Sequence, residues 1–272
     1  VDVNDSAAEG LLRIAAFLAR SGVTAWVPTL VPDSDENYRR AIGEIDRLME
    51  MQEGRAVAQA VGVHYEGVFA NEKMCGALRP QYFKKFTGPA TKPGTTPSAQ
   101  SGGHPSSNQE GRSASRSSLK RSELDDLPRL KSGVHMTTFA PEVEGGIELA
   151  AELRRQGWVA SIGHTRAEVA TLDAALAAGA RHMTHFFNAM TGIHHREVGV
   201  AGWGLSNPEV TFDIIADGVH VHPEMLKLAC REKSADKVML ISDSVAPTGL
   251  GDGEFEIWGE KVSVTNGKTQ NE

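Results

Sequence analysis

The sequence predicts an α/β fold, a (β/α)8 TIM-type barrel that is incomplete at both ends. Two observations lead to this prediction: short apolar segments alternate with segments of helical periodicity, and polar residues follow several of the apolar segments. Alternation of this kind requires parallel strands joined by crossover helices. With 272 residues, 40% of them hydrophobic and 23% charged, the chain is long enough for one barrel or two small domains.

The first predicted element is a helix whose apolar residues recur at helical spacing from Leu11 to Ala19, with Asp5 or Ser6 as its cap. The predicted strands are Thr24–Leu30, Ala56–Tyr65, Gly133–Ala140, Trp158–Gly163, Arg181–His185, Val210–Ala216 and Lys237–Ser242. The predicted helices between them are Asp35–Met51, Val143–Gln156, Arg166–Ala180 and Pro223–Glu232. Thr165 and Glu168 have the spacing of a capping box at the start of the third of these helices.

Seven strands with nothing before the first helix suggest an eight-stranded barrel whose first strand lies upstream of Val1. After Asp243 the pattern predicts only a hairpin from residue 254 to 264, so we expect the last barrel helix to be absent as well. A doubly wound open sheet is the alternative, but no glycine-rich phosphate fingerprint follows a strand.

The predicted barrel is interrupted by residues 88–118, which divide it into an N-terminal part (1–87) and a C-terminal part (119–272). The interruption is rich in Gly, Pro, Ser and Thr and contains no aliphatic side chain larger than Ala and no Phe, Tyr or Trp. Such a segment cannot bury enough apolar surface to order itself, so we expect a disordered surface insertion.

Charge, cysteine content and hydropathy indicate which partners and which compartment suit this protein. The net charge of −7 is spread without a basic face, which argues against nucleic acid or an anionic membrane as the main partner. Cys75 and Cys230 are far apart in sequence, so a reducing, cytoplasmic compartment is the simpler expectation. No apolar run is long enough to span a bilayer.

Polar residues at or just beyond the ends of five predicted strands are the strongest functional signal. They are Glu66, His164, His185, His220 and Asp243. In a parallel barrel the carboxyl ends of all strands lie on one face, so these side chains are expected to converge. One carboxylate and two imidazoles suit Zn²⁺ or Fe²⁺ with an open position for water, and a nearby unliganded aspartate could accept the proton of that water.

The remaining histidines of the predicted barrel are expected to have structural roles, as an isolated histidine usually does. They are His64, His135, His182, His194, His195 and His222.

With these residues in view, the chain resembles the N-acetylglucosamine-6-phosphate deacetylases of the amidohydrolase superfamily from Val1 to about Gly267. The matching segments are Val1-Asp-Val-Asn-Asp5, Pro28-Thr-Leu30, His64-Tyr-Glu-Gly67, Ala140-Pro-Glu142, Gly163-His-Thr165, Thr184-His-Phe-Phe-Asn-Ala-Met190, Arg196-Glu-Val-Gly199, Ala216-Asp-Gly-Val-His220 and Ser242-Asp-Ser-Val-Ala-Pro-Thr-Gly249.

The resemblance implies a role for each site residue. By it, Glu66, His164 and His185 bind at least one divalent metal, Asp243 is the general base and acid, and His220 holds the acetyl carbonyl. It also implies that the substrate is the small molecule N-acetylglucosamine 6-phosphate and that the protein is a homodimer. The residues implied to contact substrate are Ala77, Asn188, Ala189, His220 and Arg196, the last reaching the phosphate held by a neighbouring subunit.

Two positions depart from the family pattern. Val68 stands where the family commonly has proline after Glu-Gly, and Leu78 stands where many members have histidine after Gly-Ala. Two rival functions therefore remain open: another metal-dependent amidohydrolase that needs no phosphate contact, and a catalytically inert barrel that only binds a sugar phosphate.

Overall fold

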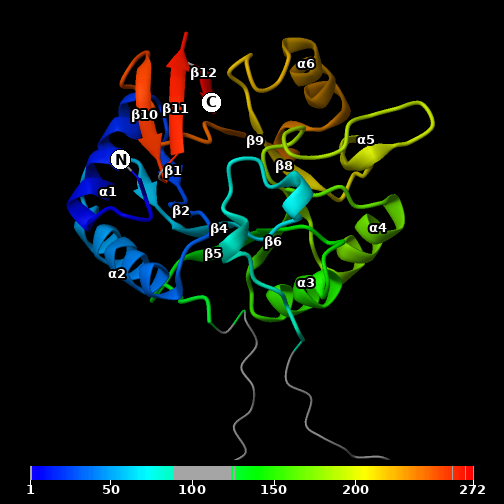
Figure 1. Ribbon diagram of the computed structural model, residues 1–272, viewed down its shortest axis with the longest axis horizontal. Helices are drawn as coiled ribbons and strands as arrows, with labels where there is room; N and C mark the ends of the chain where they lie inside the picture. Colours follow the sequence, from blue (N-terminus) through cyan, green and yellow to red (C-terminus); the bar gives the residue numbers. More distant parts are fainter. Residues whose placement is uncertain (1, 89–123, 125, 259, 267, 272) are drawn as a thin grey trace, which may run out of the picture.

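The main element of the structure, a computed structural model that describes residues 2–88, 124, 126–258, 260–266 and 268–271, is a seven-stranded parallel sheet. Its strands neighbour one another in chain order, β2-β4-β5-β6-β7-β8-β9. The sheet curls, and helices surround its outer side (Figure 1). A doubly wound sheet would reverse its strand order at a switch point, so the chain order excludes that alternative. The parallel α/β architecture is thereby confirmed.

The strands of this sheet are β2 (Thr29–Leu30), β4 (Gly62–Phe69), β5 (Val134–Phe139), β6 (Val159–Ile162), β7 (His182–Met183), β8 (Thr211–Ile215) and β9 (Val238–Ile241). The helices are α1 (Ala8–Arg20), α2 (Asp35–Met51), α3 (Gly146–Arg155), α4 (Val169–Ala178), α5 (Gly199–Ser206) and α6 (Pro223–Glu232). The short 3-10 turns are η1 (Glu72–Met74), η2 (Pro80–Tyr82) and η3 (Ala235–Lys237). Apart from Gly88, the predicted insertion at 88–118 lies outside the described residues.

Two predicted strands have different bounds in the structure. The segment predicted as Thr24–Leu30 forms two short pieces, β1 (Ala25–Trp26) and β2, separated by Val27 and Pro28, because proline has no N–H for a strand ladder. The segment predicted as Ala56–Tyr65 likewise forms β3 (Gln59–Ala60), which pairs with β1, and a longer β4. Because β4 continues to Phe69, Glu66 lies within a strand and not beyond its end.

Both predicted helix caps are wrong. Helix α1 has Ala7 at its N-cap position without a side-chain cap, and the Ser6 hydroxyl donates to the carbonyl of Asp2 instead. Helix α4 begins at Val169. Glu168 occupies its N-cap position, but the Glu168 side chain makes no capping hydrogen bond. Thr165 donates its hydroxyl to Glu142, so a tertiary contact replaces the local capping box.

The hydrophobic core lies between the sheet and the helices. Tyr65 of β4 packs edge-on against Tyr38 of α2, with 5.2 Å between ring centroids, and stacks on Trp158 at 5.9 Å. All eight residues of β4 are buried, whereas none of the four residues of β9 is buried. Strands β2 and β9 form the two edges of the sheet.

The C-terminal part forms a separate antiparallel sheet of β10 (Gly253–Ile257), β11 (Glu260–Thr265) and β12 (Lys268–Asn271). This sheet is coloured orange to red in Figure 1. The Trp258 indole N–H donates to Asp2 Oδ2 at 2.6 Å, which ties this part to the N-terminal loop. None of the described helices is long and apolar enough to cross a membrane.

Candidate metal centre

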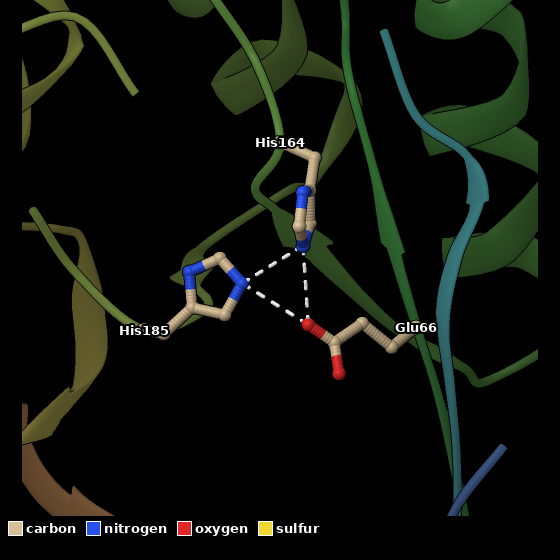
Figure 2. A group of neighbouring side chains, drawn as sticks. All are labelled: Glu66, His164 and His185. Carbon is tan, nitrogen blue, oxygen red and sulfur yellow. Dashed lines mark hydrogen bonds and ion pairs between the residues drawn. The ribbon is translucent and has the colours of Figure 1, made fainter. Parts of the chain in front are cut away.

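Glu66, His164 and His185 form a compact triangle of ligand atoms (Figure 2). Glu66 Oε1 lies 3.1 Å from His164 Nε2 and 3.0 Å from His185 Nε2, and the two Nε2 atoms are 2.9 Å apart. All three side chains are buried. They come from β4, from the turn after β6 and from the turn after β7, so three separate strands supply one site.

Backbone geometry aims these side chains at one another. His164 and His185 have φ angles of 47° and 33°, in the left-handed region that non-glycine residues rarely adopt. Glu66 precedes Gly67, whose φ is 73°, and the pairing of β4 with β5 is irregular between Tyr65 and Phe69. Strain of this kind costs on the order of 1–3 kcal/mol per residue and persists where the surrounding structure enforces it, often at functional sites.

The imidazole of His164 is also fixed through Nδ1, the ring nitrogen that faces away from the triangle. Its Nδ1 donates to the carbonyl of Met74 at 2.8 Å, which requires the proton on Nδ1 and leaves the Nε2 lone pair facing the triangle. Met74 ends η1, the short turn after β4, whose N-cap is Asn71. An imidazole fixed in this tautomer by an acceptor on its far nitrogen is typical of metal-ligating histidines.

The chemistry of these donors fits a divalent cation. Burial raises the pKa of Glu66, but the imidazoles of His164 and His185, whose Nε2 atoms lie 3.1 and 3.0 Å from its Oε1, outweigh burial and hold that pKa well below its usual range. Burial lowers the pKa of His185, but the hydrogen bond and charge of Glu66 outweigh it and raise that pKa to about 9. The triangle therefore favours an added positive charge, and its two nitrogens and one carboxylate oxygen are ligands that Zn²⁺ and Fe²⁺ accept.

Asp243 lies beside this triangle, two residues beyond the end of β9, with φ 46°. Asp243 is exposed to the cavity, yet the protein groups packed around it desolvate the carboxyl, and together with the negative charge of Glu66 they raise the pKa of Asp243 to about 6. A carboxylate whose pKa is near neutrality can both accept and return a proton. This is the property that a general base and acid requires.

A cavity of about 1640 Å³ opens over the triangle and brings most of the sequence-predicted site residues together. Lining it are Glu66, Ala77, His164, His185, Asn188, Ala189, His220 and Asp243. The imidazole of His220 is half exposed, and its Nδ1 lies 2.7 Å from Asp217 Oδ2, which orients the ring. Arg196 is exposed in the loop after β7 and does not line this cavity.

The two departures from the family pattern are neighbours in space. Leu78 is buried against Gly67, because a Cβ added at Gly67 would lie 2.1 Å from Leu78 Cδ1. Val68 is fully buried in the core. An apolar side chain thus covers the backbone next to Glu66.

Below the triangle, a layer of buried hydroxyls and one imidazole links the inner faces of four strands. His64 Nε2 lies 2.7 Å from Thr138 Oγ1, which lies 2.6 Å from Thr184 Oγ1, and Ser161 completes the layer at 2.6 Å from Thr184. Burial lowers the pKa of His64, so its imidazole remains a neutral partner of these hydroxyls. This layer supports β4, β5, β6 and β7 beneath the site.

Three groups that anchor the site were given no role by sequence reasoning. Met74 acts through its backbone, which leaves no signal in the sequence. Glu142 accepts hydrogen bonds from Asn71 Nδ2 and from the Arg166 backbone N–H, both at 2.8 Å. It therefore joins the loop after β4, which contains Asn71, to the turn after β6, which contains His164. Asp213 is the one charged residue of the predicted strand Val210–Ala216, and a carboxylate in such a strand is a signal that could have been followed.

Known proteins resemble this chain along nearly its whole length, although no family model matches it. It is 30% identical over 268 residues to N-acetylgalactosamine-6-phosphate deacetylase from Escherichia coli, an alignment that covers 98% of this chain and 62% of that protein. It is 31% identical over 264 residues to N-acetylglucosamine-6-phosphate deacetylase from Bacillus subtilis, covering 97% of this chain and 59% of that protein. The chain thus spans about 60% of the length of the curated relatives it matches.

Solved structures agree with these sequence relationships. N-acetylglucosamine-6-phosphate deacetylase from Thermotoga maritima superimposes with a TM-score of 0.75 at 27% identity, covering 100% of this chain and 64% of that one. A mutant of the Mycobacterium smegmatis enzyme, in complex with N-acetyl-D-glucosamine-6-phosphate, gives the same TM-score and identity, covering 99% of this chain and 61% of that one. The resemblance predicted from the sequence motifs is confirmed.

Proposed function

Because the chain is homologous to the N-acetylglucosamine-6-phosphate deacetylases, we propose that its protein hydrolyses the acetamide of N-acetylglucosamine 6-phosphate to glucosamine 6-phosphate and acetate. The observation that carries the proposal is the buried triangle of Glu66, His164 and His185 with Asp243 at its side. Carboxylate, two imidazoles and a carboxylate of raised pKa, all lining one cavity, are the parts that metal-assisted amide hydrolysis needs.

In the proposed reaction Glu66, His164 and His185 hold one divalent cation. Such a cation, when bound, would polarise the acetamide carbonyl and lower the pKa of water from about 15.7 towards about 7. Asp243 accepts the proton of the attacking water and later delivers it to the nitrogen of the departing amine. The water oxygen thus becomes part of acetate, and the proton that Asp243 took from water goes to the amine of the sugar as the C–N bond breaks. Asp243 therefore serves both proton transfers.

His220 is proposed to hold the acetyl carbonyl oxygen. Its Nδ1 faces Asp217, so Nε2 is the nitrogen left to face the cavity. Asn188 and Ala189, on the wall formed after β7, are proposed to contact the phosphate side of the substrate through their backbone. These assignments follow the family resemblance, and the shared cavity supports them.

Arg196 is proposed to bind the phosphate of a substrate held by a second copy of the chain. It is exposed and lies outside the lining of its own cavity, which suits a residue that acts across a dimer interface. A charge-assisted contact to phosphate contributes mainly to binding. Arg196→Ala should therefore raise the KM for the phosphorylated sugar far more than it lowers kcat; a loss of kcat at unchanged KM would contradict this role.

We also propose that the seven-stranded sheet is part of an eight-stranded TIM-type barrel whose first strand pairs between β2 and β9. Leu240 and Met239 of β9 are 73% and 51% exposed, and β9 lines the open cavity, as expected for an edge that another strand would cover. Residues 1–272 alone should then unfold without a cooperative transition. A cooperative thermal transition of a monodisperse 272-residue chain would contradict this proposal.

The proposed activity is tested by release of acetate from N-acetylglucosamine 6-phosphate, N-acetylgalactosamine 6-phosphate and unphosphorylated N-acetylglucosamine, with metal content measured in the same preparation of the whole protein. The galactosamine substrate is included because one relative is named for it. Hydrolysis that requires both phosphate and metal supports the proposal. Equal hydrolysis without phosphate would favour another amidohydrolase, and metal binding without hydrolysis would indicate a protein that only binds the sugar phosphate.

A further inference from the structure

Asp213 lies at the centre of β8 and holds the backbone where the chain leaves β7. The residue is 7% exposed, and its Oδ1 accepts the backbone N–H of His185. The backbone carbonyl of the same residue accepts the N–H of Phe186 at 2.8 Å. One residue of β8 thus fixes two successive peptide groups at the turn that presents His185 to the triangle.

The turn at His185 needs such an anchor. Its φ of 33° is the smallest of the positive non-glycine values among the described residues, and a strained backbone persists only where its surroundings enforce it. The two imidazoles also differ: His164 is held from behind by the carbonyl of Met74, whereas His185 Nδ1 is buried without a hydrogen-bond partner in the described part of the chain. His185 is therefore positioned through its backbone more than through its ring.

A second imidazole holds Asp213 in place. His182 Nε2 lies 3.1 Å from Asp213 Oδ2, and His182 Nδ1 lies 2.9 Å from Thr211 Oγ1. Since a carboxylate can only accept, Nε2 carries the proton that is donated to Asp213. Both oxygens of Asp213 are thus occupied, one by His185 and one by His182, and the carboxylate cannot rotate without losing a buried hydrogen bond.

We propose that Asp213, supported by His182, is a positioning residue for the metal centre. It fixes the left-handed turn that aims His185 Nε2 at Glu66 and His164. Asp213 also lines the cavity, but its Oδ1 is bonded to His185 and its Oδ2 to His182, so the role proposed for it is exerted through His185. The inference rests on the proposed metal-dependent function, because it assigns Asp213 to the support of that site.

The test measures the dissociation constant for Zn²⁺ by competition with a fluorescent chelator, in the whole protein and four variants. Asp213→Ala should weaken Zn²⁺ binding by about 10- to 100-fold, the usual effect of losing a group that orients a metal ligand. Asp213→Asn should bind within a few-fold of wild type, because its Oδ1 can still accept the His185 N–H. His182→Phe should weaken binding less than Asp213→Ala, since the carboxylate loses only its support.

The fourth variant, Leu149→Ala, is the matched structural control. Leu149 is fully buried on α3, and its truncation should cost about 2–5 kcal/mol of stability without touching the site. Its Zn²⁺ affinity should equal that of wild type even where its thermal stability has fallen as far as that of Asp213→Ala. Equal losses of affinity in both variants would show global destabilisation and overturn the positioning role.

Two further outcomes would overturn the inference: wild-type affinity in Asp213→Ala, or an equal loss in Asp213→Asn and Asp213→Ala. If Asp213→Ala does not fold, His182→Phe decides, and unchanged affinity in that variant contradicts the proposal. A wild-type protein that binds no Zn²⁺ would contradict the proposed function itself. Wild-type binding with unaffected Asp213 variants would contradict this inference alone.

Discussion

The polar side chains at the two ends of the seven strands have opposite environments. At the carboxyl ends, His164, His185 and Asp243 lie just beyond their strands and line one cavity. Their φ angles are 47°, 33° and 46°. At the amino ends, polar groups are tied to nearby backbone: His135 Nε2 accepts the N–H of Leu130 at 3.0 Å, and Lys233 Nζ donates to the carbonyl of Val210 at 3.1 Å. Among described residues before 253, every non-glycine residue with positive φ lies beyond the carboxyl end of a strand.

The difference separates function from stability within one sheet. Strained turns that hold donor atoms around a cavity reduce stability, so they are retained where the site requires them. Polar groups satisfied by backbone at the opposite end connect loops and helices to the sheet and contribute to stability. Substitutions at the carboxyl ends should therefore change metal binding or rate, and substitutions at the amino ends should change the free energy of unfolding.

The largest effect is expected from the three residues proposed as metal ligands. Glu66→Gln, His164→Asn and His185→Asn each remove one of three protein donors, which is the usual minimum for a catalytic metal site. Each variant should lose its metal, and its deacetylation rate should fall by more than the roughly 10²- to 10⁴-fold expected for loss of a general base. Metal content per chain and acetate release provide the measurement. If a variant still binds one metal ion per chain, the residue substituted in that variant is not a metal ligand.

The next effect is expected at Asp243. Asp243→Asn keeps the shape and hydrogen-bonding capacity of the side chain but cannot accept a proton, so hydrolysis should fall by about 10²- to 10⁴-fold while metal stays bound. The same metal and rate assays separate it from the ligand variants. Loss of metal would make Asp243 a ligand, and near-full activity would contradict the proton-transfer role.

At the amino ends the sharpest test is Trp158. Its ring centroid lies 5.0 Å from that of His135, with the two ring planes tilted by 35°, and 5.2 Å from the guanidinium carbon of Arg129; Trp158 is 5% exposed. Trp158→Ala should therefore cost about 3–5 kcal/mol of unfolding free energy, measured by denaturant titration of the whole protein. Zn²⁺ affinity of the folded variant should not change. A variant that folds normally but loses metal affinity would break the proposed division between the two ends.

The smallest effect concerns pH and His135. Burial, and then the positive charge of Arg129, lower the pKa of His135 below its unfolded value of 6.5. Above about pH 6.5 the imidazole is neutral in both states, so it contributes no pH dependence. As the pH falls below 6.5 the unfolded chain binds the proton first, so stability should decrease.

His135→Gln provides the control for this pH effect. Because His64 also has a lowered pKa, the decrease in melting temperature between pH 7 and pH 5 should be shallower in His135→Gln than in wild type, but not absent. Identical slopes in the two proteins would show that His135 does not titrate with folding.

Several elements could be predicted from the sequence because their signals are local. Helix α6 begins and ends where the pattern places it, at Pro223 and Glu232, because proline at the first turn and an apolar period are both written in the segment itself. The same local reasoning is wrong for Thr165, whose hydroxyl binds Glu142 of another loop instead of capping α4. Helix α5 was not predicted, since its glycines and small residues carry little helical signal.

The sequence by itself determined the alternation of parallel strands and helices, because periodicity is a signal within a few residues. It also determined which polar residues come near the carboxyl ends of strands, because their place in the chain is read directly. Tertiary structure decided how those residues meet. Glu66 lies inside β4, and its partner His185 is 119 positions away, so their 3.0 Å separation depends on the curl of the sheet. The anchors at Met74 and Asp213 likewise act on histidines brought to them only by folding, because a backbone carbonyl and a carboxylate within a strand acquire their partners from packing and not from their neighbours in sequence.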